Sequence, residues 1–280
     1  MNAAANTISF QGMPGAYSMM ACQLAYPDMM PLPCRTFEEA FQAVTDGAAK
    51  LAMIPIENSV AGRVADIHHL MPQSGLKIVA EHFQRVNHQL LGVEGATIEE
   101  LTHVHSHVQA LSQCRKLIND LGIEPVVHVD TAGAAEDVAA GGDKTQAAIS
   151  SELAADLNSL NVLRTDVEDS ETNTTRFVVL SREPIDPGLN REDVITTFVF
   201  EVRNIPASLY KALGGFATNG INITKLESYV DSDFNAAQFY ADVAAHPKQE
   251  SMQLAMEELQ FFTHNVQILG TYPASSMRNR

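Results

Sequence analysis

The chain has 280 residues, 45% of them hydrophobic, and a formal net charge of −16 from 18 Lys and Arg against 34 Asp and Glu. Such an acidic chain is a poor binder of phosphate backbones, because non-specific affinity for nucleic acid comes from basic residues. A small anion could still bind, given a local arginine or oriented backbone N–H groups. We therefore expect no nucleic-acid partner, and the length suggests about two domains.

Cysteine usage and the N-terminal residues indicate a cytoplasmic protein. Cys22, Cys34 and Cys114 are an odd number and form no C-x-x-C pair, which argues against a disulfide framework. The first residues, MNAAANTISF, lack the basic and apolar regions of a signal peptide. No apolar run approaches the roughly 20 residues that span a membrane, so we expect no membrane partner.

The first half of the chain alternates strands and helices. Strands are predicted at 7–10 and 51–56, and helices at 16–25 and 37–45. This spacing is typical of βαβ units and a mainly parallel sheet. Gly12-Met13-Pro14-Gly15 forms the first turn, which could hold an anion but is more often only a tight turn. Residues 78–91 are instead extended, without an intervening helix.

The alternation then resumes. Residues 103–105 predict a short strand, and Ser106-x-x-Gln109 is a capping box that predicts a helix from Ser106 to Gly122. Further strands are predicted at 125–129, 146–149 and 177–180, and further helices at 132–140 and 151–160. Residues 181–191, SREPIDPGLNR, predict a linker, because they contain two prolines and a glycine.

A separate small unit follows the linker. Residues 194–202 alternate as a strand, and apolar residues at helical spacing predict a helix around 209–217. Two strands, a helix and a last strand follow, at 223–230, 237–243, 249–263 and 266–269. The order βαββαβ is the ferredoxin-like arrangement.

Three polar patches are candidate sites. His103, His105 and His107 alternate like metal ligands, but no carboxylate or cysteine lies at a helpful spacing, which favours ordinary histidines. Glu57-Asn58-Ser59 follows a predicted strand, and ligands of open α/β sheets bind at such ends. Thr174-Thr175-Arg176-Phe177 places hydroxyls and an arginine where a polar loop enters a strand. Each patch alone also fits a cap, a turn or a solvated face.

Taken together, the patches resemble one family. FQGMPGAYS (10–18), PIENSVAG (55–62), HSHVQALSQC (105–114) and NTTRF (173–177) resemble the motif series of prephenate dehydratases, in order and at similar spacing. GFATNGINITKLES (215–228) resembles the ACT domain that usually follows. The resemblance covers nearly the whole chain.

The resemblance implies an α/β fold with two domains. Residues 1–182 would form a two-lobed catalytic unit similar to type II periplasmic-binding-protein folds, and 194–275 a ferredoxin-like ACT regulatory domain. Lobe one would hold 1–80 and 175–182, and lobe two 85–165. Members of the family usually form homodimers or homotetramers and are usually inhibited by phenylalanine, the expected effector.

The implied activity is the conversion of prephenate to phenylpyruvate with loss of water and carbon dioxide, without metal or organic cofactor. Thr175 matches the catalytic threonine, Asn58 a neighbouring polar position, and Glu57 is the alternative general acid. Arg176 is the expected carboxylate partner, because guanidinium binds carboxylates bidentately. The other expected substrate-site residues are Phe177, Ser59, Ser106, Gln113, Tyr17 and Ser18.

The implied regulatory residues are Asn204, Ala207, Ser208, Leu209, Asn222, Glu227 and Ser228. Two segments depart from the family pattern there: Gly-Ala-Leu is Ala207-Ser208-Leu209, and Glu-Ser-Arg-Pro is 227–230, Glu-Ser-Tyr-Val. Inhibition by phenylalanine therefore stays open. Two alternatives also stay open: an arogenate dehydratase, with an amino group on the substrate, and a non-catalytic amino-acid sensor. The intact Thr175-Arg176 and Glu57-Asn58 favour catalysis.

Overall fold

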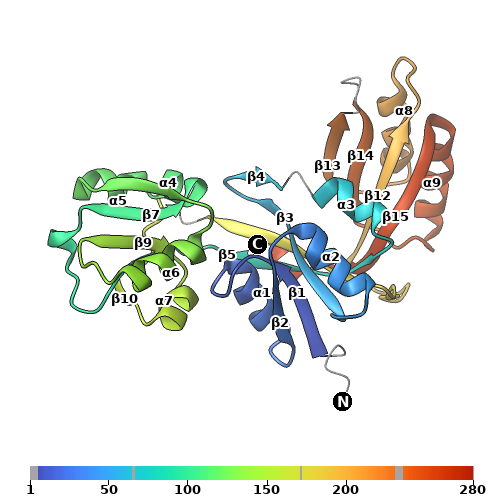
Figure 1. Ribbon diagram of the computed structural model, residues 1–280. Coiled ribbons are helices and arrows are strands. Elements are labelled where there is room, and N and C mark those ends of the chain that lie inside the picture. The colour runs from blue at the N-terminus through green and yellow to red at the C-terminus, as the bar shows by residue number, and fades with distance from the viewer. Residues whose placement is uncertain (1–5, 65–66, 171, 231–235, 280) are drawn as a thin grey trace. The chain divides into compact units, whose positions relative to one another are not determined.

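The computed structural model describes residues 6–64, 67–170, 172–230 and 236–279 (Figure 1). The chain divides into two compact units. The first holds Met1–Val64 and His82–Phe177, and the second holds Ala65–Glu81 and Val178–Arg280. Each unit has its own sheet region and its own hydrophobic core.

The first unit begins with parallel strands covered by helices. β1 pairs in parallel with both β2 and β3, and the strand order is β11-β3-β1-β2. Thr36 begins α2, because its side chain accepts a hydrogen bond from the Glu39 N–H. The elements are β1 (Thr7–Gln11), α1 (Tyr17–Ala25), β2 (Met30–Cys34), α2 (Phe37–Thr45), β3 (Leu51–Asn58), β4 (Gly62–Arg63) and the start of β11 (Thr174–Ser181).

β2 is a strand that the sequence pattern does not predict. Its sequence, MPLPC, has prolines at 31 and 33, which cannot donate to a neighbouring strand. β2 lies at the edge of its sheet, where a proline can turn its missing donor away from β1. β3 is two residues longer than expected, so Glu57 and Asn58 belong to the strand itself.

The rest of the first unit is built on a five-stranded sheet of order β10-β6-β9-β7-β8 (green in Figure 1). Leu90 and Ile149 pack with α4 and α5, whereas Leu91 and Ala148 pack with α6 and α7. Neighbouring residues of a strand point to opposite faces, so helices cover both faces. The strands are β6 (Gln89–Gly92), β7 (His103–His107), β8 (Glu124–His128), β9 (Gln146–Ser150) and β10 (Asn161–Arg164). The helices are α4 (Val108–Gln113), α5 (Arg115–Leu121), α6 (Thr131–Gly141) and α7 (Glu152–Asn158).

The expected capping box at Ser106 is wrong. Ser106 lies in β7, fully buried, and its hydroxyl donates to the Ile149 carbonyl at 2.6 Å. His107 caps α4 instead, because its Nδ1 accepts from the Gln109 N–H at 3.3 Å. The helix also breaks at Cys114 into two pieces. The serine hydroxyl is used across the sheet, which a local sequence pattern cannot show.

The turn after β1 packs directly against α7. Gly15 has a φ of +90°, and a Cβ there would lie 2.9 Å from the Cα of Ala154. The Ser151 hydroxyl donates to the Gly15 carbonyl at 2.6 Å and accepts from the Ala154 N–H at 3.0 Å. One buried serine therefore caps α7 and holds the glycine turn.

The second unit has the predicted βαββαβ order, and the expected fold class is confirmed. β12 pairs antiparallel with β14 and β15, and Phe198 stacks on Phe216 with ring centroids 5.7 Å apart. Gly270 pairs with Ile78 of β5, where a Cβ would lie 2.1 Å from a carbonyl oxygen. The elements are α3 (Ile67–Gln73), β5 (Lys77–Arg85, in part), β12 (Val194–Val202), α8 (Ser208–Thr218), β13 (Ile223–Val230), β14 (Ala236–Val243), α9 (Glu250–Phe262) and β15 (Thr263–Pro273). Short 3-10 helices lie at Ile98–Glu100 in the first unit and Ser276–Asn279 in the second.

A charged cluster ties β5 to β14 inside the second unit. Arg278 donates to both carboxylate oxygens of Glu81, at 2.7 and 2.9 Å, and to Asp242 at 3.1 Å. Both carboxylate side chains are fully buried. In the ranges that the structure describes, no helix is long and apolar enough to cross a membrane.

Candidate active site

The end of β3 is tied to the start of β11. The Ser59 N–H donates to the Thr174 carbonyl at 2.9 Å, and the Thr174 N–H donates back to the Ser59 hydroxyl at 2.9 Å. The same hydroxyl donates to the Thr172 carbonyl at 2.6 Å. Ser59 therefore joins the two strands that carry Asn58 and Thr175, two residues far apart in sequence.

A pocket of about 260 Å³ opens beside this junction in the first unit. Six of the ten expected catalytic and substrate residues line it: Tyr17, Ser18, Asn58, Gln113, Thr175 and Phe177. They come from α1, β3, α4 and β11, so the fold gathers them from four separate elements. His88, His107 and Asp130 supply the ionisable groups of its lining besides Tyr17.

The other four expected residues are not among those that line this pocket. Ser59 and Ser106 bond to backbone, as described above. Arg176 is 3% exposed, and its Nη1 donates to Glu57 Oε1 at 2.9 Å. Arg176 follows Thr175 in a strand, so the two side chains point to opposite faces. Arg176, which the sequence predicts to bind a carboxylate of the substrate, thus binds the carboxylate of Glu57 instead.

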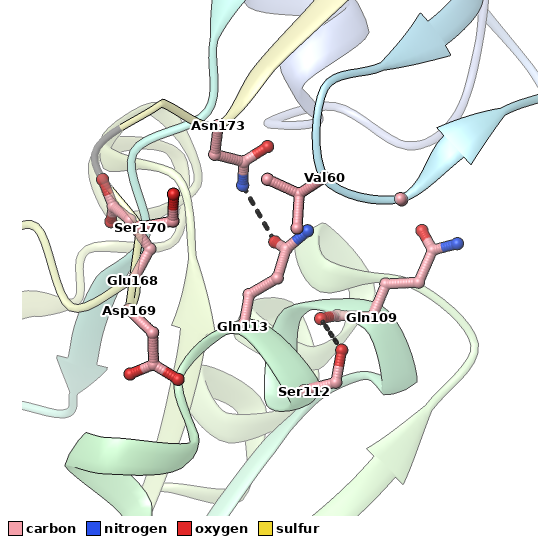
Figure 2. A pocket seen from close by; sticks show the side chains of 9 residues that line it. Val60, Gln109, Ser112, Gln113, Glu168, Asp169, Ser170 and Asn173 are labelled. Carbon is pink, nitrogen blue, oxygen red and sulfur yellow. Dashed lines mark hydrogen bonds between the residues drawn. The ribbon is translucent and has the colours of Figure 1, made fainter.

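A second pocket, of about 350 Å³, shares Ala61, Gln109 and Gln113 with the first (Figure 2). Figure 2 shows Gln113 and Asn173 pointing toward each other, and Asn173 Nδ2 donates to Gln113 Oε1 at 2.9 Å. Asn173, from the loop before β11, is a site residue that the sequence interpretation missed. Its position in NTTRF was quoted only as part of a motif, and no spacing rule distinguishes it.

The amide of Asn58 has one possible orientation. Its Oδ1 accepts from the backbone N–H groups of Val60 and Ala61, at 2.9 and 2.8 Å. Backbone N–H groups only donate, so the other end of the amide is the NH₂ group. That group donates to Asn173 Oδ1 at 2.8 Å and to Thr175 Oγ1 at 2.9 Å. Thr175 is therefore an acceptor toward Asn58.

The hydroxyl hydrogen of Thr175 is left for the pocket. A threonine hydroxyl has one hydrogen and two lone pairs, and Asn58 occupies one lone pair. Within the described part of the chain, no acceptor for that hydrogen is found, and Thr175 lines the pocket. The site can thus present one oriented O–H donor to a ligand.

His88 is the second residue that sequence reasoning missed. It is 2% exposed, and its ring lies between the Tyr17 hydroxyl, 2.9 Å from Nδ1, and Gln113 Oε1, 3.0 Å from Nε2. Burial lowers its pKa from the ordinary 6.5, although Gln113 and the Glu168 carboxylate act in the other direction. No sequence signal marks it, because it belongs to none of the motifs and its partners, Tyr17 and Gln113, are distant in sequence.

Each of the three alternating histidines makes a hydrogen bond within the first unit. His103 Nδ1 bonds to the Thr102 hydroxyl at 2.8 Å, His105 Nε2 bonds to Gln146 at 2.7 Å, and His107 caps α4. Across residues 6–64, 67–170, 172–230 and 236–279, no group of three histidines, cysteines or carboxylates is placed to hold a metal ion.

Comparison with known proteins identifies the family. The prephenate dehydratase family model matches residues 8–185. The chain belongs to the prephenate dehydratase family. It is therefore related to hydro-lyases, and the expected enzyme class is confirmed.

Relatives of this family fall into several activity classes. The chain is 51% identical to a "bifunctional N-acyl-homoserine lactone acylase/prephenate dehydratase" of Komagataeibacter europaeus, over 98% of both chains. It is 40% identical to "arogenate dehydratase/prephenate dehydratase 1" of Arabidopsis thaliana, over 97% of this chain and 73% of the relative.

Solved structures of the family agree with this fold. A structure described as GqqA, a quorum-quenching acylase, has a TM-score of 0.91 at 51% identity and covers 97% of this chain and 99% of its own. A prephenate dehydratase from Arthrobacter aurescens, solved with L-Phe, has a TM-score of 0.88 at 27% identity and covers 97% of this chain and 91% of its own.

The residues that prephenate dehydratase motifs predict for regulation lie in the second unit. Ala207 precedes α8, Ser208 and Leu209 begin it, Asn222 precedes β13, and Glu227 and Ser228 lie within β13. Asn204 lies in the loop before α8. Ala207 has a φ of +62°, in the left-handed region that favours glycine, which is the residue the family pattern has there.

Proposed function

We propose that the protein is a prephenate dehydratase that converts prephenate to phenylpyruvate. In this reaction the ring C–OH bond breaks and the departing oxygen takes up a proton to leave as water. The bond between the ring and its carboxylate breaks as well, carbon dioxide leaves, and the electron pair completes the aromatic ring. Aromatisation drives the reaction, so the main requirement is a donor at the departing oxygen.

The observation that carries this proposal is the orientation of Thr175. Because Asn58 donates to its oxygen at 2.9 Å, the threonine hydrogen is free to bond a ligand in the pocket. A threonine hydroxyl is a weak acid, so its role is a placed hydrogen-bond donor or relay. Gln109, Gln113 and Ser18 supply further neutral donors to the lining.

A turnover assay with prephenate and arogenate side by side tests the proposal. Each substrate is supplied with and without EDTA, and phenylpyruvate and phenylalanine are quantified by chromatography. We expect phenylpyruvate from prephenate in both buffers. Faster turnover of arogenate would assign the alternative dehydratase activity, and no turnover of either substrate would leave the amino-acid sensor.

A second candidate activity is acyl hydrolysis, favoured by the acylase names that the 51% identical curated protein and the 51% identical solved structure carry. The reaction needs a nucleophile or an activated water, and Thr175 is a lining hydroxyl whose oxygen the Asn58 amide holds in place. N-acyl homoserine lactone hydrolysis is measured for the wild type and for Thr175→Val. Loss of hydrolysis in the variant would assign both activities to this pocket.

For the second unit we propose an ACT domain that binds phenylalanine and lowers turnover. The support is its βαββαβ order and the phenylalanine bound to the Arthrobacter relative. Allosteric control requires phenylalanine to bind two states of the protein with different affinities. An effector must therefore bind measurably to the protein. Calorimetric titration with millimolar phenylalanine tests this proposal. If no heat of binding is measured, phenylalanine is not the effector. A homodimer or homotetramer is part of the same proposal, tested by light scattering.

A further inference from the structure

A chain of hydrogen-bonded side chains runs from Thr175 through the first unit. Asn58 donates to Thr175 and to Asn173, Asn173 donates to Gln113, and Gln113 Oε1 lies 3.0 Å from His88 Nε2. His88 Nδ1 lies 2.9 Å from the Tyr17 hydroxyl. The ring of His88 is thus connected through side chains to the proposed donor, Thr175.

The direction of every bond in this chain follows from its Asn58 end. Asn58 must donate to Asn173, because backbone N–H groups occupy its oxygen. Asn173 therefore turns its oxygen to Asn58 and its NH₂ group to Gln113. Gln113 must then present its oxygen to both Asn173 and His88. An oxygen cannot donate, so His88 Nε2 must carry a hydrogen.

The Tyr17 hydroxyl lies at the other end of the ring. It donates to the Asn87 carbonyl at 2.7 Å and lies 2.9 Å from His88 Nδ1. Burial favours the neutral ring, and the Glu168 carboxylate accepts from the His88 backbone N–H at 2.9 Å. The neutral ring thus carries its hydrogen on Nε2, where the Gln113 oxygen requires it.

We propose that His88 is a positioning residue for the dehydration. Its Nε2–H holds the Gln113 oxygen in place for the Asn173 amide. Asn173 in turn accepts from the Asn58 amide, so the position of the group that bonds Thr175 depends on His88. The threonine hydrogen is then presented to the departing hydroxyl of the substrate. The proposal rests on the proposed function, because it concerns the same reaction and the same donor.

Three substitutions at His88 separate this role from packing. In His88→Gln the amide NH₂ group can take the place of Nε2–H, whereas in His88→Asn the shorter side chain reaches only the Nδ1 position. His88→Leu removes both contacts. A misplaced catalytic group costs about 10²-fold in rate. With prephenate, we expect kcat to fall roughly that far for Asn and Leu and only a few-fold for Gln, with KM changed little throughout.

His105→Leu is the matched control, since His105, in β7 of the same unit, also bonds a glutamine through Nε2, at 2.7 Å, but lies outside this chain of bonds. We expect its kcat to remain near that of the wild type. Equal kcat values for the Gln and Asn variants would overturn the proposal. Circular dichroism spectra of all variants confirm that folded protein is compared, and if His88→Leu does not fold, the Gln and Asn pair decides alone.

A double-mutant cycle with Thr175→Val distinguishes this inference from the proposed function. If His88 acts through Thr175, His88→Leu or His88→Asn should cost nothing further in kcat once the hydroxyl is gone. If the His88 substitutions lower kcat by the same factor in the wild type and in Thr175→Val, His88 does not act through Thr175. Thr175 could still be the donor in that case. A Thr175→Val enzyme with near wild-type kcat would instead remove Thr175 as the donor, and with it the role of His88, whereas the dehydratase activity itself would stand.

Discussion

Arg176 Nη1 donates to Glu57 Oε1 at 2.9 Å, one residue away from the threonine that faces the pocket. The arginine side chain is 4% exposed and that of the glutamate 34%. Loss of the glutamate would weaken the pairing of the buried arginine charge, which is destabilising. The pair therefore holds β3 to β11, the strands that position Asn58 and Thr175.

The first prediction follows from this pair. Arg176→Lys replaces a planar fork with a point charge, and we expect it to lower the free energy of unfolding by about 1–3 kcal/mol, discounted for the partial exposure of Glu57. Urea titration measures the loss. A KM for prephenate that rises tenfold or more without a loss of stability would show that Arg176 binds substrate instead, as the sequence analysis expects.

The second prediction concerns the donor. Thr175→Val keeps the shape of the side chain and removes the hydroxyl, so kcat should fall by roughly 10²–10⁴, the usual contribution of one proton-transfer group. Thr175→Ser keeps the hydroxyl and should retain much of the activity. Steady-state kinetics with prephenate decides. A nearly active Thr175→Val beside an inactive Glu57→Gln would transfer the acid role to Glu57.

The third prediction concerns pH. The pKa values of His82 and His88 are lowered from 6.5 in the folded state, first because of burial. Below about pH 6.5 the unfolded chain therefore binds more protons than the folded chain, and stability falls as the pH falls. Urea titrations at about pH 7.5 and about pH 5.5 measure how steeply the free energy of unfolding changes with pH. His88→Gln should make it shallower, and an unchanged slope would contradict the assignment.

The fourth prediction concerns the thiols. Burial raises the pKa of Cys22 to about 12 and also raises the pKa values of Cys34 and Cys114. Thiolate is the reactive form, so at about pH 8 the native protein should react slowly with a disulfide reagent. The three cysteines should react at once in denaturant. Fast reaction of even one native thiol would show that its side chain reaches solvent.

The fifth prediction concerns Ala207, whose φ is +62°. A non-glycine residue in this region costs about 1–2 kcal/mol, and glycine loses about 0.4–1 kcal/mol more backbone entropy on folding. Ala207→Gly should therefore stabilise the second unit by up to about 1 kcal/mol and, by restoring the family residue, tighten phenylalanine binding. Ser159→Gly, at a φ of +55° in the first unit, is the control: it should leave phenylalanine binding unchanged.

The sequence predicts the elements that have strong periodicity. The bounds of α2, β12 and β13 agree with those expected, since each has a clear apolar period and a clear end. The sequence does not predict β2 or β10. β2 contains two prolines, and β10 has only four residues, so each is recognised as a strand only by its pairing with a neighbour.

The candidate site is predictable only in part. Thr175, Asn58 and Gln113 are found through their motifs, and the structure brings them to one pocket. His88 and Asn173 belong to the same hydrogen-bond chain, yet their role depends on partners 25 and 115 residues away. Such contacts are a property of the folded chain, and no local pattern encodes them.

The contact between Ser151 and Gly15 bears on how a ligand enters the first unit. Many two-lobed binding proteins close around a ligand, and the free energy that closure requires lowers the apparent affinity for the ligand. Here a buried serine already bonds the turn after β1 at 2.6 Å, and Ala154 fills the space beside the glycine. Opening at this point would break that bond. A rigid inhibitor shaped to the existing cavity should therefore bind without an energetic penalty for closure.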